Sequence, residues 1–296
     1  MTAIARLPRN YKSVPAEPAR ARIESLDQDG RGVAHIDGKA VFIEGALPGE
    51  DVLFTYRTRR KRYDEGVVAQ VLTPSPARVT PQCAHFGVCG GCSLQHLASA
   101  AQIEAKQQIL LDALEHIGKV RPNEIIPPLH GPAWGYRRKA RLGAKYVIKK
   151  EKMLVGFREK RSALLADLTR CEILHPAVGA RLPELRALLM RLESYNQIPQ
   201  IEVAVGDENV ALVFRHLAPL DEQDREQLRN FGQAHAMQIY LQPAGPDSVT
   251  LLWPVAPGVL PPVTLAHPCA SVAPGVLPPV TLAHPCASVA PGVLPP

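Results

Sequence analysis

The 296-residue sequence predicts an α+β protein in which a small N-terminal β-barrel precedes a central domain of helices and strands. Two observations support this fold class. Short alternating strand patterns, separated by Gly and Asp turns, fill residues 21–74, which is typical of a five-stranded barrel of the OB type. Helical periodicity then alternates with paired strand patterns as far as residue 254, which favours an α+β domain at 75–254.

The barrel prediction depends on tight turns between short strands. Asp29-Gly30, Asp37-Gly38 and Pro48-Gly49 provide these turns, because glycine adopts the positive φ that they need. The five strands are expected at Ala21–Asp27, Gly32–Ile36, Lys39–Glu44, Asp51–Tyr56 and Gly66–Leu72.

The central domain is expected to combine three helices with an antiparallel sheet. The helices are predicted at Ser99–Ile117, Pro183–Ser194 and Asp221–Ala234. The first has one apolar face, which we expect to pack on the neighbouring cysteine loop; its members are Ile103, Leu110, Leu111, Leu114 and Ile117. The hairpins pair Ala140–Val147 with Leu154–Arg158, Ile201–Val205 with Val210–Phe214, and Met237–Leu241 with Ser248–Trp253.

The two ends of the chain differ from these domains. Residues 1–20 carry basic side chains and prolines but little apolar periodicity, which predicts a flexible basic arm. At 255–296 a proline-rich unit of 17 residues, Val255–Ser271, recurs at Val272–Ser288. Proline interrupts helices and central strands, so this tail is expected to be disordered or an artefact of the sequence. We expect no metal site at its repeated cysteines, Cys269 and Cys286.

Charge is distributed unevenly along the chain. Residues 1–161 hold 27 Lys and Arg against 16 Asp and Glu, whereas residues 162–296 hold 7 against 12. A basic front half suggests a polyanionic partner, and we expect it to be RNA. Two basic stretches, Arg57–Tyr63 and Tyr136–Arg161, are candidate RNA contacts, the alternative for each being a solvated surface. The candidates are Arg57, Arg59, Arg60, Lys61, Arg62 and Tyr63 in the first, and Arg137, Arg138, Lys139 and Arg141 in the second.

Four cysteines suggest a metal or cluster site. Cys83, Cys89 and Cys92 have the spacing C-x5-C-x2-C, and Cys171 follows 79 residues later. Three ligands from one loop and a distant fourth favour a [4Fe–4S] cluster. Zinc, which commonly takes two close cysteine pairs, and inert buried cysteines are the alternatives. Nearby His85 and His96 are expected to be hydrogen-bonding neighbours rather than ligands.

The order of these motifs resembles the iron–sulfur-containing RNA uracil-C5 methyltransferases. The resemblance is carried by Gly30–Glu50, Cys83–His96, Tyr136–Leu142 and Cys171. It implies a TRAM barrel that binds RNA, a [4Fe–4S] cluster on the four cysteines, S-adenosylmethionine as methyl donor and 23S ribosomal RNA as partner. We expect a cytoplasmic monomer without a membrane association, because no signal peptide or membrane-spanning stretch is evident.

The sequence also departs from the pattern of that family. It contains no glycine-rich cofactor loop after a strand and no catalytic cysteine outside the repeat. The expectation is therefore that the Rossmann-like methyltransferase domain is missing, with no catalytic or S-adenosylmethionine-binding residue, and that the chain is inactive alone. The alternative is a self-sufficient iron–sulfur RNA-binding protein without enzymatic activity. A radical methylthiotransferase is disfavoured because its C-x3-C-x2-C motif is absent.

Overall fold

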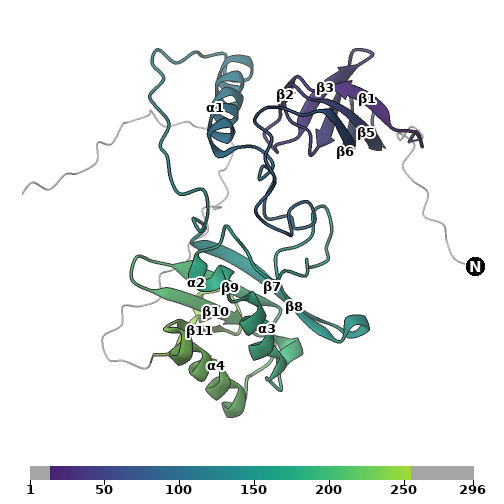
Figure 1. Cartoon of the computed structure of the whole chain (residues 1–296). Helices are drawn as coiled ribbons and strands as arrows, with labels where there is room; N and C mark the ends of the chain where they lie inside the picture. The colour runs from purple at the N-terminus through teal and green to yellow at the C-terminus, as the bar shows by residue number, and fades with distance from the viewer. Residues whose placement is uncertain (1–13, 255–296) are drawn as a thin grey trace, which may run out of the picture. The chain divides into compact units, whose positions relative to one another are not determined.

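A computed structural model describes residues 14–254, which contain two six-stranded sheets and the segments that connect them (Figure 1). The repeat tail, with Cys269 and Cys286, lies outside the described residues, as do residues 1–13 of the predicted basic arm. No helix among residues 14–254 has the length and apolar character needed to cross a membrane.

The N-terminal sheet has the strand order β1-β5-β6-β4-β3-β2. Its strands are β1 (Ala19–Arg22), β2 (Ser25–Leu26), β3 (Gly32–Ile36), β4 (Lys39–Glu44), β5 (Asp51–Arg59) and β6 (Tyr63–Thr73). The prediction of five strands is wrong, because the first segment is divided in two. The Ile23 amide donates a hydrogen bond to the Glu50 carbonyl, whereas the Glu24 amide donates to the Val33 carbonyl. β4 and β6 pair in parallel, and the other pairs are antiparallel.

Alternation along these strands forms the first core. Val41 and Ile43 of β4 and Val52 and Phe54 of β5 are at most 1% exposed, as expected where every second side chain faces inward. Gly66 of β6 is required by this packing, because a Cβ there would lie 2.5 Å from the Phe54 ring. The close approach of Phe54 to Gly66 thus helps to fix the register in which β5 and β6 pair.

Helix α1 (Ser99–His116) packs differently from the prediction. None of its residues is fully buried. Its small residues Ala101 and Ala105, with Ile109, pack against a cluster that includes Leu97. The predicted apolar face does not point inward as a whole, since Leu110 is 58% exposed. The i, i+4, i+8 spacing of the small side chains therefore determines the packed face.

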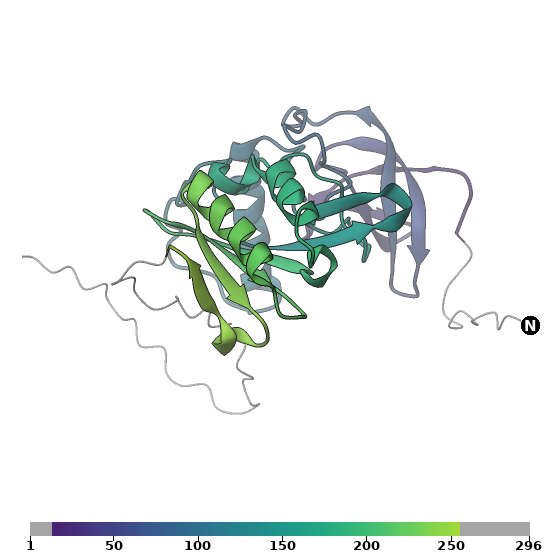
Figure 2. The same ribbon diagram turned by 90° about the horizontal axis from the view of Figure 1, so that it is seen from below.

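The second sheet has the order β12-β11-β10-β9-β7-β8. Its strands are β7 (Lys139–Val147), β8 (Lys152–Gly156), β9 (Gln200–Val205), β10 (Val210–Arg215), β11 (Gln238–Gln242) and β12 (Thr250–Trp253). The helices are α2 (Pro176–Gly179), α3 (Leu182–Met190) and α4 (Glu222–His235), with short 3-10 turns at Ile148–Lys150, Tyr195–Gln197 and Pro246–Ser248. Helices α3 and α4 lie on the same face of the sheet (Figure 2).

The predicted antiparallel sheet is wrong at one pair. β10 and β11 run parallel, because α4 connects them as a crossover over one face of the sheet. The predicted inward residues of α3 are confirmed: Leu185, Leu188 and Leu189 are at most 1% exposed. Gly232 lets α4 approach closely, since a Cβ there would lie 2.7 Å from Ile239 and from Trp253.

Candidate functional site

The loop that carries Cys83, Cys89 and Cys92 is held by main-chain hydrogen bonds to the segment after β8. The Gly90 amide donates to the Arg158 carbonyl at 2.8 Å, and the Lys160 amide donates to the Val88 carbonyl at 2.8 Å. Cys89 and Glu159 form an isolated antiparallel bridge. At Gly90 a Cβ would lie 3.1 Å from the Arg158 carbonyl oxygen, so glycine permits this close pairing.

Cys171 is brought to the same place by the segment between β8 and α2. Its amide donates to the Gly179 carbonyl at 3.0 Å, and a Cβ on Gly179 would overlap the Cys171 carbonyl oxygen. His85 of the cysteine loop accepts a hydrogen bond from the Thr169 amide at 3.0 Å and contacts its hydroxyl at 2.9 Å. These bonds join two segments that are about 80 residues apart in sequence.

The four predicted cysteines line one small cavity, and none of them forms a disulfide. The other lining residues are His85, Phe86, Gly91, Gln95, Phe157, Leu168, Arg170, Glu172 and Ile173. Burial raises the pKa of the Cys89, Cys92 and Cys171 thiols. The positive charges of Arg137 and Lys160 act in the opposite direction on Cys92, as does a hydrogen bond with Gln95.

A preformed metal site is not found in the part of the chain that the structure describes. Within residues 14–254 no group of three or more His, Cys, Asp or Glu side chains could hold a metal ion. The iron–sulfur centre that was expected as part of the fold is therefore not seen in residues 14–254. The four cysteines surround a cavity, and their role as ligands remains a prediction.

The two predicted neighbouring histidines have different surroundings. His85 makes the hydrogen bonds to Thr169 described above, which confirms the predicted hydrogen bonding at this residue. His96 is 3% exposed and lies 5.3 Å from the Phe86 ring, centroid to centroid. Neither of its ring nitrogens has a hydrogen-bond partner among residues 14–254, so the prediction is wrong for this residue. Burial lowers the pKa of His96 to about 4, which keeps the ring neutral at physiological pH.

A second, larger cavity of about 870 Å³ lies beside the cysteines, and we call it the basic cleft. Its lining is Asp29, Gly30, Arg31, Glu44, Gly45, Gly90, Gly91, Ser93, Arg137, Phe157, Arg158, Glu159, Lys160, Arg161, Ser162 and Ala163. Gly91 and Phe157 line both cavities. The basic cleft and the cysteine cavity therefore share part of one wall.

The first predicted basic stretch does not form one exposed loop. β5 continues through Arg57 and Arg59, and β6 already begins at Tyr63. Arg57 pairs with Glu44 at 2.9 Å and Arg59 with Asp64 at 3.5 Å. The remaining cations are at the turn, where the Arg60 guanidinium lies 5.3 Å from the centre of the Tyr63 ring and both Lys61 and Arg62 are exposed. Acidic neighbours thus compensate part of the charge that the sequence displays.

Of the second predicted stretch, only Arg137 lines the basic cleft. Its guanidinium lies 5.4 Å from the centre of the Phe157 ring, a cation–π distance. Arg138 pairs with Asp207 at 2.7 Å, and Arg141 pairs with Glu202 at 3.1 Å. Lys139 is exposed on β7.

Four further cations line the basic cleft, namely Arg31, Arg158, Lys160 and Arg161. The last three lie in the predicted stretch Tyr136–Arg161, although they were not singled out as contacts within it. Nothing in the sequence indicated that Arg31, in the turn before β3, would lie beside them.

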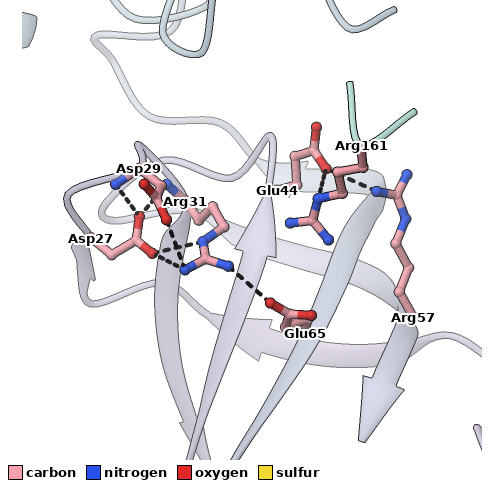
Figure 3. A network of polar contacts seen from close by, with 7 residues as sticks. All are labelled: Asp27, Asp29, Arg31, Glu44, Arg57, Glu65 and Arg161. Carbon is pink, nitrogen blue, oxygen red and sulfur yellow. Dashed lines mark hydrogen bonds and ion pairs between the residues drawn. The ribbon is translucent and has the colours of Figure 1, made fainter. Parts of the chain in front are cut away.

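Two ion-pair networks of opposite sign lie at the rim of the N-terminal sheet (Figure 3). Arg31 is surrounded by three carboxylates, Asp27, Asp29 and Glu65, at 2.7, 3.3 and 3.1 Å. Glu44 is surrounded by three cations instead. These are Arg57, Lys160 and Arg161, at 2.9, 3.2 and 3.6 Å.

Comparison with known proteins shows extensive similarity. The TRAM domain family model matches residues 17–53, within the N-terminal sheet. The 23S rRNA (uracil(1939)-C(5))-methyltransferase RlmD of Nitrosococcus oceani is 57% identical over 244 residues, which is 82% of this chain and 55% of that protein. The protein of the same name from Hahella chejuensis is 50% identical over 246 residues, 83% of this chain and 55% of that protein. The chain thus spans about half the length of the curated relatives it matches.

A solved structure shares the fold. The tRNA (uracil-54, C5)-methyltransferase of Pyrococcus abyssi, in complex with S-adenosyl-L-homocysteine, aligns with a TM-score of 0.51 and 21% identity. The alignment covers 75% of this chain and 50% of that structure. The expectation that the architecture of a methyltransferase is missing from the chain is therefore wrong. The inactivity that was inferred from that absence has no support.

Proposed function

We propose, from the premise that this chain belongs to the family of RNA uracil-C5 methyltransferases, that it acts in the C5 methylation of a uridine in 23S ribosomal RNA. The observation that carries the proposal is the 57% identity to the Nitrosococcus oceani enzyme over 82% of this chain. The contribution of the described residues is RNA binding, through the basic cleft beside the TRAM-matching sheet.

RNA binding would depend on the cations that line the basic cleft. Arg137 and Arg158 can neutralise backbone phosphates, which is the main contribution to affinity for nucleic acids. The Phe157 ring, already in contact with the Arg137 guanidinium, offers an apolar surface for a base. Affinity should accordingly fall steeply as the salt concentration rises.

The cofactor part of the proposal concerns the cysteine cavity. Cys83, Cys89, Cys92 and Cys171 would hold a [4Fe–4S] cluster, and the support is that four free thiols from two segments surround one small cavity. A cluster of four irons needs ligands distributed around a volume, whereas a single ion needs them to converge on one point. Such a cluster supplies an inorganic link between the loop and the Cys171 segment, next to the wall that the basic cleft shares.

The methyl donor would be S-adenosylmethionine, as membership of the family implies. The Pyrococcus abyssi enzyme was solved with S-adenosyl-L-homocysteine, which is what remains of that donor after the methyl group has been transferred. The residues of this chain described above would bind the RNA rather than the methyl donor.

The test is selective binding followed by competition. The full chain should bind a 23S rRNA fragment that contains the uridine methylated by the relatives more tightly than a 16S rRNA fragment of equal length. In excess, it should also slow methylation of the 23S fragment by the Nitrosococcus oceani enzyme supplied with labelled S-adenosylmethionine. Equal affinity for both fragments, together with an unchanged methylation rate, would refute the proposal.

A further inference from the structure

We propose that Arg57 and Arg161 form a binding site for one phosphate of the RNA backbone, and that Glu44, which also pairs with Lys160, holds this site closed until the phosphate displaces it from the two arginines. The inference deepens the proposed function, because it assumes that the polyanionic partner is RNA. It assigns a role to a carboxylate in the basic cleft, where acidic side chains should disfavour the partner.

The geometry of the site is that of one anion among three cations. Glu44, at the end of β4, is 16% exposed in its side chain. One carboxylate oxygen, Oε2, lies 2.9 Å from Arg57 Nη1 and 3.6 Å from Arg161 Nε, and the other lies 3.2 Å from Lys160 Nζ. Figure 3 shows dashed lines that join one oxygen of this carboxylate to Arg57 and to Arg161.

The charges around Glu44 leave an excess of two positive charges. Burial disfavours its ionised form, but the hydrogen bond from Lys160 and the charges of the three cations outweigh burial and lower its pKa. The carboxylate is therefore ionised at neutral pH. Arg31 is the opposite case, because its three carboxylates leave an excess of negative charge. An anion that enters the basic cleft is accordingly attracted towards Glu44 and repelled from Arg31.

The three cations are not equally free to change partner. The side chain of Lys160 is 18% exposed, its main chain is bonded to Val88, and its ammonium lies 5.1 Å from the centre of the Phe86 ring. Arg57 and Arg161 are 44% and 40% exposed. We therefore assign the phosphate to the two arginines, whose guanidinium groups can donate two hydrogen bonds each. Lys160 remains paired with Glu44.

Competition with Glu44 gives the site selectivity. An anion that displaces Glu44 breaks its ion pairs with the two arginines. Only a phosphate that other contacts also hold in place gains enough binding free energy to offset that loss. Removing the carboxylate should therefore strengthen RNA binding and expose more cationic charge to the RNA, with a loss of selectivity.

The experiment compares Glu44→Gln with a matched variant, Glu65→Gln, which removes the same charge from the network of Arg31. Binding of the 23S fragment is measured between 50 and 300 mM salt. At about 150 mM salt, E44Q should bind about three- to tenfold more tightly, with a salt slope steeper by about one. E65Q should change affinity less than about twofold, because Asp27 and Asp29 still neutralise Arg31. R161Q should weaken binding, and more strongly in the E44Q background.

Two outcomes would overturn the inference. Unchanged or weaker RNA binding by an E44Q chain that unfolds at the wild-type temperature would show that Glu44 does not compete with the phosphate. An equal gain in E65Q would show a general charge effect.

A titration with inorganic phosphate separates this inference from the proposed function. In the E44Q chain, where the carboxylate no longer competes, the side-chain Nε–H signals of Arg57 and Arg161 should shift by NMR. If phosphate shifts them but RNA does not bind, the proposed function fails and the anion site remains. If RNA binds but neither signal responds to phosphate, the inference fails.

Discussion

The cysteine cavity and the basic cleft share part of a wall, but they are held in place by different interactions. Main-chain hydrogen bonds position the cysteines, as between Gly90 and Arg158 and between Cys171 and Gly179. Side-chain ion pairs position many of the nearby cations, as between Arg57 and Glu44. Main-chain bonds fix a residue regardless of its side chain, whereas an ion pair also decides how much charge a residue presents to a ligand.

This difference predicts how the two regions respond to substitution. Each cysteine is one of four that surround a single cavity, so the loss of one thiol should disable the whole site. The basic cleft distributes its cations over several segments, so each substitution should remove only one contribution.

Cys171→Ser should abolish nearly all iron binding in protein that is purified anaerobically. A serine hydroxyl is a poor substitute for the thiolate, and Cys171 is the one proposed ligand that comes from the second segment. Iron, acid-labile sulfide and visible absorption are the measurements. Cys269→Ser, in the repeat outside the described residues, is the matched control and should retain the iron. Full iron content in C171S would remove this cysteine from the ligand set.

His96 should make folding stability depend on pH. Burial lowers its pKa to about 4, whereas a histidine in the unfolded chain has a pKa of about 6.5. Between these values the unfolded state binds a proton that the folded state rejects, so stability falls as the pH falls below about 6.5. The free energy of unfolding should be about 2 kcal/mol lower at pH 5 than at pH 7.5 because of this group.

His96→Phe should remove that dependence, because phenylalanine cannot bind a proton and can keep the contact with Phe86. Urea unfolding at several pH values gives the measurement. An H96F protein with the wild-type slope would show that another group titrates.

Arg137→Gln together with Arg158→Gln should weaken binding of the 23S fragment about tenfold at 150 mM salt, and reduce the salt slope by about one to two. Both cations line the basic cleft. Fluorescence anisotropy across a salt titration measures both quantities. Unaltered affinity would exclude the basic cleft as the RNA surface.

Arg138→Gln together with Arg141→Gln should weaken binding less than about threefold. Both arginines already pair with carboxylates, Asp207 and Glu202, and neither lines the basic cleft. The same titration applies, with the R137Q/R158Q protein as the comparison because it loses the same formal charge. A larger effect here than in that protein would place RNA on the β7 surface.

The parts of the fold set by local pattern were predictable from sequence. β3 and β4 begin and end where expected, because Asp37-Gly38 forces the turn between them. The division of the first strand and the parallel pairing of β10 and β11 depend on contacts between distant segments. Sequence periodicity does not contain that information.

The residues of the candidate site were likewise predictable from sequence only in part. The spacing of Cys83, Cys89 and Cys92, with the later Cys171, indicated residues that line one cavity. A count of positive charges did not indicate which arginines face the cleft, because the fold brings acidic partners such as Glu44 and Asp64 to some of them. A structure is therefore needed to decide which long charged side chains line the cleft.

Photo-cross-linking tests the central claim, that RNA binds in the basic cleft, most directly. The 23S fragment with 4-thiouridine in place of uridine is irradiated with the full chain, and the linked peptides are identified by mass spectrometry. If RNA binds there, cross-links form at residues 157–163 and at Gly90, Gly91 and Ser93, which line the cleft. Cross-links confined to the turn at Arg60–Arg62 or to the exposed face of β7, with none at those segments, would contradict it.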